Sequence, residues 1–139
     1  MSAQRPRPSG LVDEAGLIEV LFYGAPSPRT VRHGRVWVPP TDVYETEDML
    51  VALVELASIK QSDFTVSLFE RRLIVTGVRA DHGPVRRAVH QMEVPFGEFR
   101  TEVDLPVSVD ASKVDAEYAD GFLRIMLPKL KLHNIPVQE

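Results

Sequence analysis

Apolar and polar residues alternate along much of the chain that follows residue 37. In residues 64–68, 99–105 and 114–118, apolar side chains occupy every second position. Successive side chains of a β-strand point to opposite faces of a sheet, so this period predicts strands with one buried and one wet face. Residues 50–56 are almost wholly apolar, which predicts a strand buried on both faces.

Turn signals separate these strands and set their pairing. The charged break at residues 70–72 lies between the strand at 64–68 and a β-rich run at 73–78, which predicts a hairpin. Asp120-Gly121 leads into residues 122–127 and is a strong signal for a second hairpin. A shorter strand is predicted at residues 42–46, and Pro128 ends the last strand. Short strands at close spacing, with no convincing helix after residue 37, predict an all-β fold, an antiparallel β-sandwich over residues 37–129.

Residues 1–36 form an arm rather than a domain, because prolines and glycines recur too often for any long regular element. Asp13 and Glu14 precede an apolar stretch, which allows a short helix with acidic residues at its positive end. The arm either packs onto its own domain or contacts other chains. The apolar residues that would make contact with other chains are Leu17, Ile18, Val20, Leu21, Phe22 and Tyr23.

A long excursion and a short tail interrupt the sandwich pattern. Residues 80–84 have loop chemistry, whereas residues 88–93 could form a strand that projects from the sandwich and pairs with the edge of a second subunit. An ordinary ordered loop is the alternative. The tail, residues 130–139, carries Ile135-Pro136-Val137. Because Pro136 biases Ile135 towards an extended conformation, Ile135 and Val137 project to the same side, either by chance or as an anchor for another protein.

Composition excludes several classes of function. A chain of 139 residues supports one core, and the absence of cysteine excludes disulfides and thiolate zinc sites. A net charge of −4 disfavours nucleic acid, and neither a signal peptide nor a membrane span is evident. No phosphate-binding loop, nucleophile elbow or metal-ligand spacing is present, so we expect no enzyme activity, cofactor or metal. The four histidines without ligand spacing are His33, His82, His90 and His133.

Four motifs, in their order and spacing, resemble those of the small heat shock proteins. They are WVPPTDVYET at residues 37–46, VPFGEF at 94–99, VDLP at 103–106 and AEYADGFL at 116–123. The alpha-crystallin domain of that family would cover residues 37–129. The segment Ile135-Pro136-Val137 is similar to the C-terminal isoleucine-x-isoleucine/valine plug of the family.

The resemblance implies an immunoglobulin-like sandwich and an ATP-independent chaperone that holds unfolding proteins. It implies cytoplasmic homo-oligomers built from dimers of the bacterial and plant type, which exchange a strand, and it implies that the plug enters a groove on a neighbouring sandwich. The exchanged strand would be Val89, His90, Gln91, Met92 and Glu93. The groove would lie between Val66 with Leu68 and Val114 with Ala116.

Some positions depart from the family pattern. Leu56-Ala57-Ser58 stands where leucine-proline-glycine is usual, so that turn loses its usual conformational restrictions. Asp120 replaces asparagine, which a left-handed turn tolerates, and Phe122 replaces valine. Asp104 stands where a basic residue is frequent. The main alternative function is a co-chaperone or scaffold of the related CS-domain type, which would bind one folded partner and need not assemble.

Overall fold

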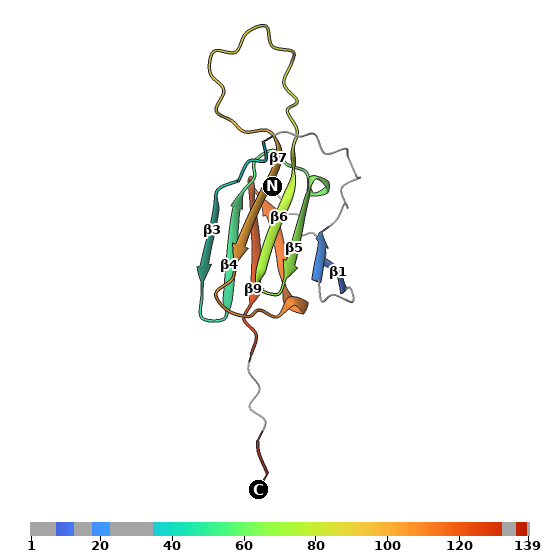
Figure 1. Ribbon diagram of the computed structural model, residues 1–139, viewed down its shortest axis with the longest axis vertical. Coiled ribbons are helices and arrows are strands. Elements are labelled where there is room, and N and C mark those ends of the chain that lie inside the picture. Colours follow the sequence, from blue (N-terminus) through green and yellow to red (C-terminus); the bar gives the residue numbers. More distant parts are fainter. Residues whose placement is uncertain (1–7, 13–17, 23–34, 132–135, 139) are drawn as a thin grey trace.

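Two antiparallel β-sheets pack face to face in the computed structural model (Figure 1). The structure describes residues 8–12, 18–22, 35–131 and 136–138. Within these residues the only helical elements are two 3-10 turns, η1 (Gln61–Asp63) and η2 (Ala111–Lys113). None of the described helices is long and apolar enough to cross a membrane. The prediction of an all-β sandwich is confirmed.

One sheet has four strands in the order β3-β4-β9-β8. Its central strand β4 is apolar on both faces: Leu50, Ala52 and Val54 are fully buried towards the core, while Val51 and Leu53 point to the outer face. The alternation of β9 and β8 aims their apolar positions at the same core. The bounds are β3 Thr41–Glu45, β4 Met49–Glu55, β8 Asp115–Ala119 and β9 Phe122–Pro128.

The second sheet has five strands in the order β1-β2-β5-β6-β7. The short helix that the sequence allows after Asp13 is not found at residues 18–22, which form β2 and pair with both β1 and the edge of β5. Pairing with an existing sheet edge overrides a weak local helix signal, which rested only on two acidic residues. The bounds are β1 Pro8–Val12, β2 Ile18–Phe22, β5 Phe64–Phe69, β6 Arg72–Arg79 and β7 Gly97–Asp104.

The core lies between the sheets and is made by the inward positions that the alternation predicts. Phe64 and Phe99 are its largest side chains, and each is at most 1% exposed. Gly77 is required beside them, because a Cβ there would lie 2.5 Å from the Phe99 ring and 2.2 Å from the Asp63 carbonyl. No described buried side-chain polar atom lacks a hydrogen-bond partner.

Three described residues other than glycine have left-handed backbone, and they lie in tight turns. Asp120 has φ +52° and Gly121 +82°, which confirms the predicted hairpin between β8 and β9. Glu70 has φ +53° in the hairpin between β5 and β6. Ser58 has φ +58° at the position where the sequence departs from leucine-proline-glycine. Ser58 thus adopts a left-handed conformation that glycine would adopt without strain.

Candidate interaction surfaces

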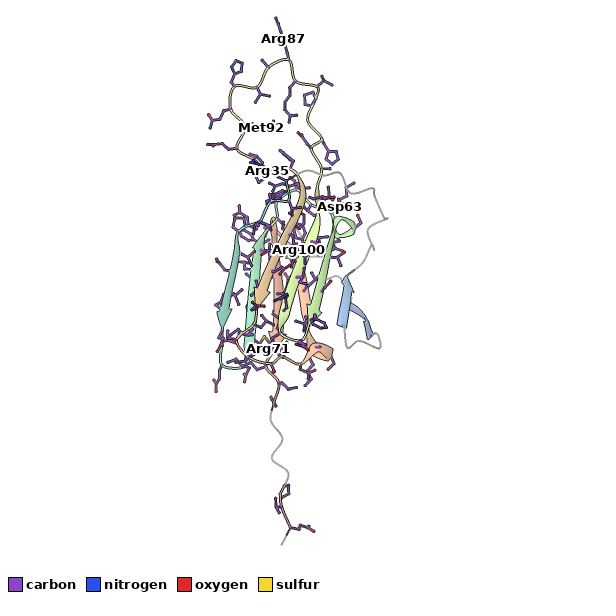
Figure 2. All side chains as sticks on the ribbon, in the orientation of Figure 1. Arg35, Asp63, Arg71, Arg87, Met92 and Arg100 are labelled. Carbon is purple, nitrogen blue, oxygen red and sulfur yellow. The ribbon has the colours of Figure 1, made fainter. Side chains whose placement is uncertain are left out.

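The connection between β6 and β7, residues 80–96, stands away from the sandwich as a long open loop (Figure 1). All of its side chains are exposed, among them Val89 at 53%, Met92 at 60% and Val94 at 60%. Figure 2 shows Met92 and Arg87 on this loop, far from the core. Residues 89–93, predicted to be an exchanged strand, form no strand within the single chain. They present unpaired backbone and apolar side chains at the position where the exchange would occur.

Arg79, the last residue of β6, fixes the neck of this loop. Its guanidinium lies 4.4 Å from the centre of the Trp37 ring and 5.3 Å from that of Phe96, so it is stacked between two aromatic side chains. Its Nε donates to the Pro95 carbonyl at 2.9 Å, and Nη2 donates to the same oxygen. Nη1 donates to the Ala57 carbonyl at 3.5 Å.

Arg79, Trp37 and Phe96 form a group that we call the Arg79 cluster, and no carboxylate among the described residues pairs with its guanidinium. Arg79 is only 9% exposed, and the described residues give it no ion pair. A planar guanidinium can satisfy its donors on carbonyl oxygens and its faces on aromatic rings, which an ammonium group cannot do equally well. Trp37 is fixed in turn, because Nε1 donates to the Gly97 carbonyl at 3.2 Å and its ring packs on Phe99. Both ends of the loop are therefore anchored to the rigid sandwich.

A small turn orders the first part of the loop. The Asp81 carboxylate accepts from the Gly83 amide at 2.9 Å and from the Arg86 guanidinium at 2.6 Å. These hydrogen bonds, the one from Gly83 foremost, hold the pKa of Asp81 below its ordinary value. The ionised form therefore favours this turn at neutral pH, and protonation on acidification would weaken it.

Strand β3 leaves one edge of the four-stranded sheet open. It is the first strand in the order of that sheet and pairs only with β4 among the described strands. Asp42, Val43, Tyr44 and Glu45 are all exposed. An open strand edge offers backbone donors and acceptors to an additional strand.

The predicted groove residues come together in the structure, but inside the core. Val66 and Leu68 on β5, Val114 before β8 and Ala116 on β8 are each at most 4% exposed and belong to one buried cluster. Strand β2 lies along the edge of β5, with Ile18 opposite Leu68. In the described part of the chain no open groove therefore separates β5 from β8.

The predicted plug and arm are only partly within the described residues. Pro136 and Val137 are exposed, Val137 at 90%, whereas Ile135 lies outside the described residues. In the arm, the residues that form part of β2 are Ile18, Val20, Leu21 and Phe22. Leu17 and Tyr23 lie outside the described residues.

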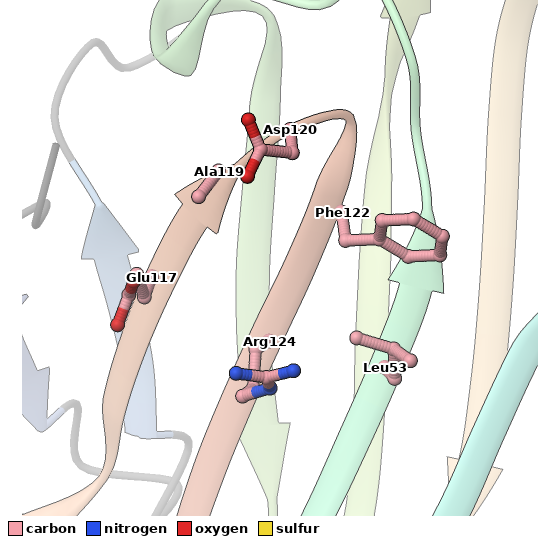
Figure 3. Close-up of a pocket in the computed structure, with 6 residues that line it drawn as sticks. All are labelled: Leu53, Glu117, Ala119, Asp120, Phe122 and Arg124. Atoms are coloured by element: carbon pink, nitrogen blue, oxygen red, sulfur yellow. The ribbon is translucent and has the colours of Figure 1, made fainter. Parts of the chain in front are cut away.

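A surface that the sequence interpretation did not identify lies on the outer face of the four-stranded sheet. Leu53 and Phe122 line a depression of about 320 Å³ together with Arg124 (Figure 3). Two signals in the sequence pointed there: the almost wholly apolar run at residues 50–56, and the aromatic residue at position 122. The remaining lining residues are Glu117, Ala119 and Asp120.

The described residues contain no cluster of three or more histidine, aspartate or glutamate side chains that could hold a metal ion. His82 and His90 are exposed on the loop, and His33 and His133 lie outside the described residues. The chemistry of these surfaces is that of protein contact: open backbone edges and exposed apolar side chains.

The model of the Hsp20/alpha crystallin family matches residues 42–138. The chain belongs to this family. A probable 15 kDa heat shock protein of Leptospira interrogans is 28% identical over 97 residues, 70% of this chain and 74% of that protein. Small heat shock protein C2 of Rickettsia felis is 27% identical over 93 residues, 66% of this chain and 60% of that protein.

Solved structures of small heat shock proteins resemble this chain in fold. Heat shock protein 16.0 of Schizosaccharomyces pombe superposes with a TM-score of 0.62 and 26% identity, covering 73% of this chain and 96% of that one. A small heat shock protein of Xylella fastidiosa gives a TM-score of 0.62 and 27% identity, covering 76% and 100%. The chain is thus a small heat shock protein with an alpha-crystallin β-sandwich. This is a family of chaperones rather than enzymes, and it implies homo-oligomers and client binding.

Proposed function

We propose that this protein is an ATP-independent holdase of the cytoplasm, which binds unfolding proteins and prevents their aggregation. The observation that carries the proposal is exposed apolar surface on a family sandwich: the loop of residues 80–96 would serve contact between subunits, while Tyr44 at 46% and Phe122 at 42% stay open on the four-stranded sheet. A protein that binds unfolded chains opposes their aggregation by mass action, and exposed apolar surface suffices for that without nucleotide chemistry.

The assembling unit is a dimer that exchanges residues 89–93. In an extended conformation, Met92 and Val94 would point to the same side, so the segment could present an apolar face to a partner. The open edge of β3 on a second copy supplies the backbone groups that such a strand needs. The Arg79 cluster supports this role because it holds both ends of the loop in place.

Larger oligomers form through the tail. Ile135 and Val137 would enter the space between β5 and β8, where Val66, Leu68, Val114 and Ala116 lie. Because β2 covers the edge of β5 in the single chain, this docking requires β2 to leave that edge. The arm would then be free to contact clients and neighbouring subunits.

Light scattering of the full chain, combined with a model-client aggregation assay over a range of temperatures, tests this function. We expect a mass well above that of a monomer and suppression of client aggregation at near-stoichiometric amounts without ATP. Met92→Asp in the loop should shift the mass towards monomers, because a charge would have to be buried in the dimer contact. Arg87→Asp, which changes charge at another exposed loop position, is the control. A monomeric wild-type protein without anti-aggregation activity would instead favour a CS-domain-like module with one specific partner.

A further inference from the structure

The outer face of the four-stranded sheet carries a diagonal band of apolar side chains. The strand register places Tyr44, Val51 and Met126 in one cross-strand row, Leu53 next on the same face of β4, and Phe122 diagonally beyond it on β9. Tyr44 is 46% and Phe122 42% exposed. Figure 3 shows Leu53 and Phe122 close together at the end of the band. The solvated face of an antiparallel sheet is ordinarily polar, so this band suggests a contact surface.

The charge around the band is strongly one-sided. Five carboxylates surround a single guanidinium, that of Arg124, and no ion pair forms at any of these six groups within the described residues. The carboxylates belong to Asp42, Glu55, Asp115, Glu117 and Asp120. Acidic groups that stay unpaired next to exposed apolar area form a negative rim that favours cations at this face.

The outer face of the five-stranded sheet differs in its charge, because two of its carboxylates form ion pairs. On its outer face Arg72 pairs with Asp104 at 3.3 Å, and Arg100 pairs with Glu102 at 2.6 Å. Its interior strand β6 contributes Ile74, which is half-buried like Leu53 on β4, and Phe69 on β5 is 39% exposed. The acidic, apolar surface is therefore a property of one sheet and not of the whole molecule.

The depression at the end of the band is suited to a long cationic side chain. Phe122 and Leu53 provide apolar contact for an aliphatic stem. Glu117 and Asp120 line the same depression and place two carboxylates against the one guanidinium of Arg124 (Figure 3). An exposed aromatic ring also attracts a cation over its face. Lysine and arginine both combine an apolar stem with a charged end.

We propose that this face binds extended client segments in which apolar residues alternate with lysine or arginine. The apolar side chains would lie on the band, and the cations would reach the carboxylates at its rim. The inference rests on the proposed holdase function and adds a substrate preference, because acidic segments of equal hydrophobicity would be repelled by the same carboxylates.

Binding of two labelled 12-residue peptides to the full-length protein, measured by fluorescence anisotropy, tests the preference. One peptide alternates valine with lysine and the other valine with glutamate. We expect the lysine peptide to bind at least about tenfold more tightly, and its binding to weaken as salt is added. The double variant Leu53→Ser and Phe122→Ser should weaken binding of the lysine peptide by about tenfold. Ile74→Ser, the matched change on the other sheet, should bind as the wild type does.

Asp42→Lys with Glu117→Lys changes the rim and leaves the band and the core in place, so it tests the inference even if the serine variant fails to fold. It should remove the difference between the two peptides. Equal affinity of the wild type for both peptides would overturn the inference, as would an equal loss in Ile74→Ser. A fall in oligomeric mass in Asp42→Lys with Glu117→Lys would do so too, because the face would then be a contact between copies. If the wild type suppresses aggregation but shows no peptide preference, only this inference fails; if it suppresses none, the holdase function itself fails.

Discussion

At the scale of single residues, the Arg79 cluster shows how the sandwich positions its loop. The guanidinium of Arg79 joins three separate parts of the chain: the Trp37 ring, the Ala57 carbonyl and the Pro95–Phe96 segment before β7. Each contact depends on a planar, delocalised cation. The loop that we propose to exchange between subunits thus emerges from a rigid base, although its own residues make few contacts.

We predict that Arg79→Lys lowers the free energy of unfolding by about 1–3 kcal/mol, because it removes the stacking and the paired hydrogen bonds while keeping the charge. Urea denaturation measures the loss. Trp37 is the single tryptophan of the chain, so its emission reports on this cluster directly and should shift in the variant. Arg100→Lys, at an exposed position, should change stability by less than about 0.5 kcal/mol. If both variants were equally stable and the emission did not move, the cluster would have no role in holding the neck.

At the scale of elements, β2 is the strand that the sequence did not predict. Its five residues carry no alternation strong enough to distinguish strand from helix. They form a strand because they pair with the edge of β5, about fifty residues away in sequence. Strands β5, β7 and β8, by contrast, follow directly from their alternation, because each has one buried and one wet face.

The candidate surfaces also divide into features that local sequence predicts and features that depend on residues distant in sequence. The sequence predicted that residues 80–96 leave the sandwich, because residues with loop chemistry interrupt the alternation there. It did not predict that Arg79 fixes the ends of this loop, because the partners of Arg79 are distant in sequence. The family resemblance implied a groove at Val66 and Val114, on faces that the pattern predicts to be apolar, and neither pattern nor resemblance separates a groove from a core. The outer-face band also depends on the register between β4 and β9, which only the fold supplies.

Removing residues 1–23 should expose the edge of β5, because both strands that extend the sheet there are lost. In the Ile135→Gly with Val137→Gly background, where no plug can take this edge, we expect the deletion to speed hydrogen exchange in residues 64–69, measured by mass spectrometry. In the chain with its plug, the deletion should weaken suppression of client aggregation. Removing residues 1–7 alone keeps β1 and β2 and should leave both properties as in the full chain. Unchanged protection of residues 64–69 in the longer deletion would mean that β2 does not protect this edge in solution.

At the scale of the whole molecule, the two ends of the chain compete for one place. In the assembly that we propose, the tail plug requires the edge of β5 that β2 occupies in the single chain, so only one of them can be there at a time. A plug from another subunit gains contact with the apolar residues between the sheets, whereas β2 is favoured by belonging to the same chain. The assembly of larger oligomers should therefore be accompanied by the release of β2 from the edge of β5.

Changing both Ile135 and Val137 to glycine should reduce the oligomer towards dimers. Burial of these two side chains contributes about 2–5 kcal/mol per tail before the cost of ordering, a weak contact singly but a strong one when many tails act together. The strand-exchanged dimer does not use them and should persist, so light scattering should find a smaller, discrete mass rather than a monomer. Gln138→Gly with Glu139→Gly changes the adjacent residues, removes no apolar area and should retain the wild-type mass. An unchanged mass in the plug variant would refute the role of Ile135 and Val137, while a monomer would show that the tail also holds the dimer together. In the plug variant β2 should stay on β5, so slower hydrogen exchange in residues 18–22 than in the wild-type oligomer would show that the tail displaces β2 from this edge.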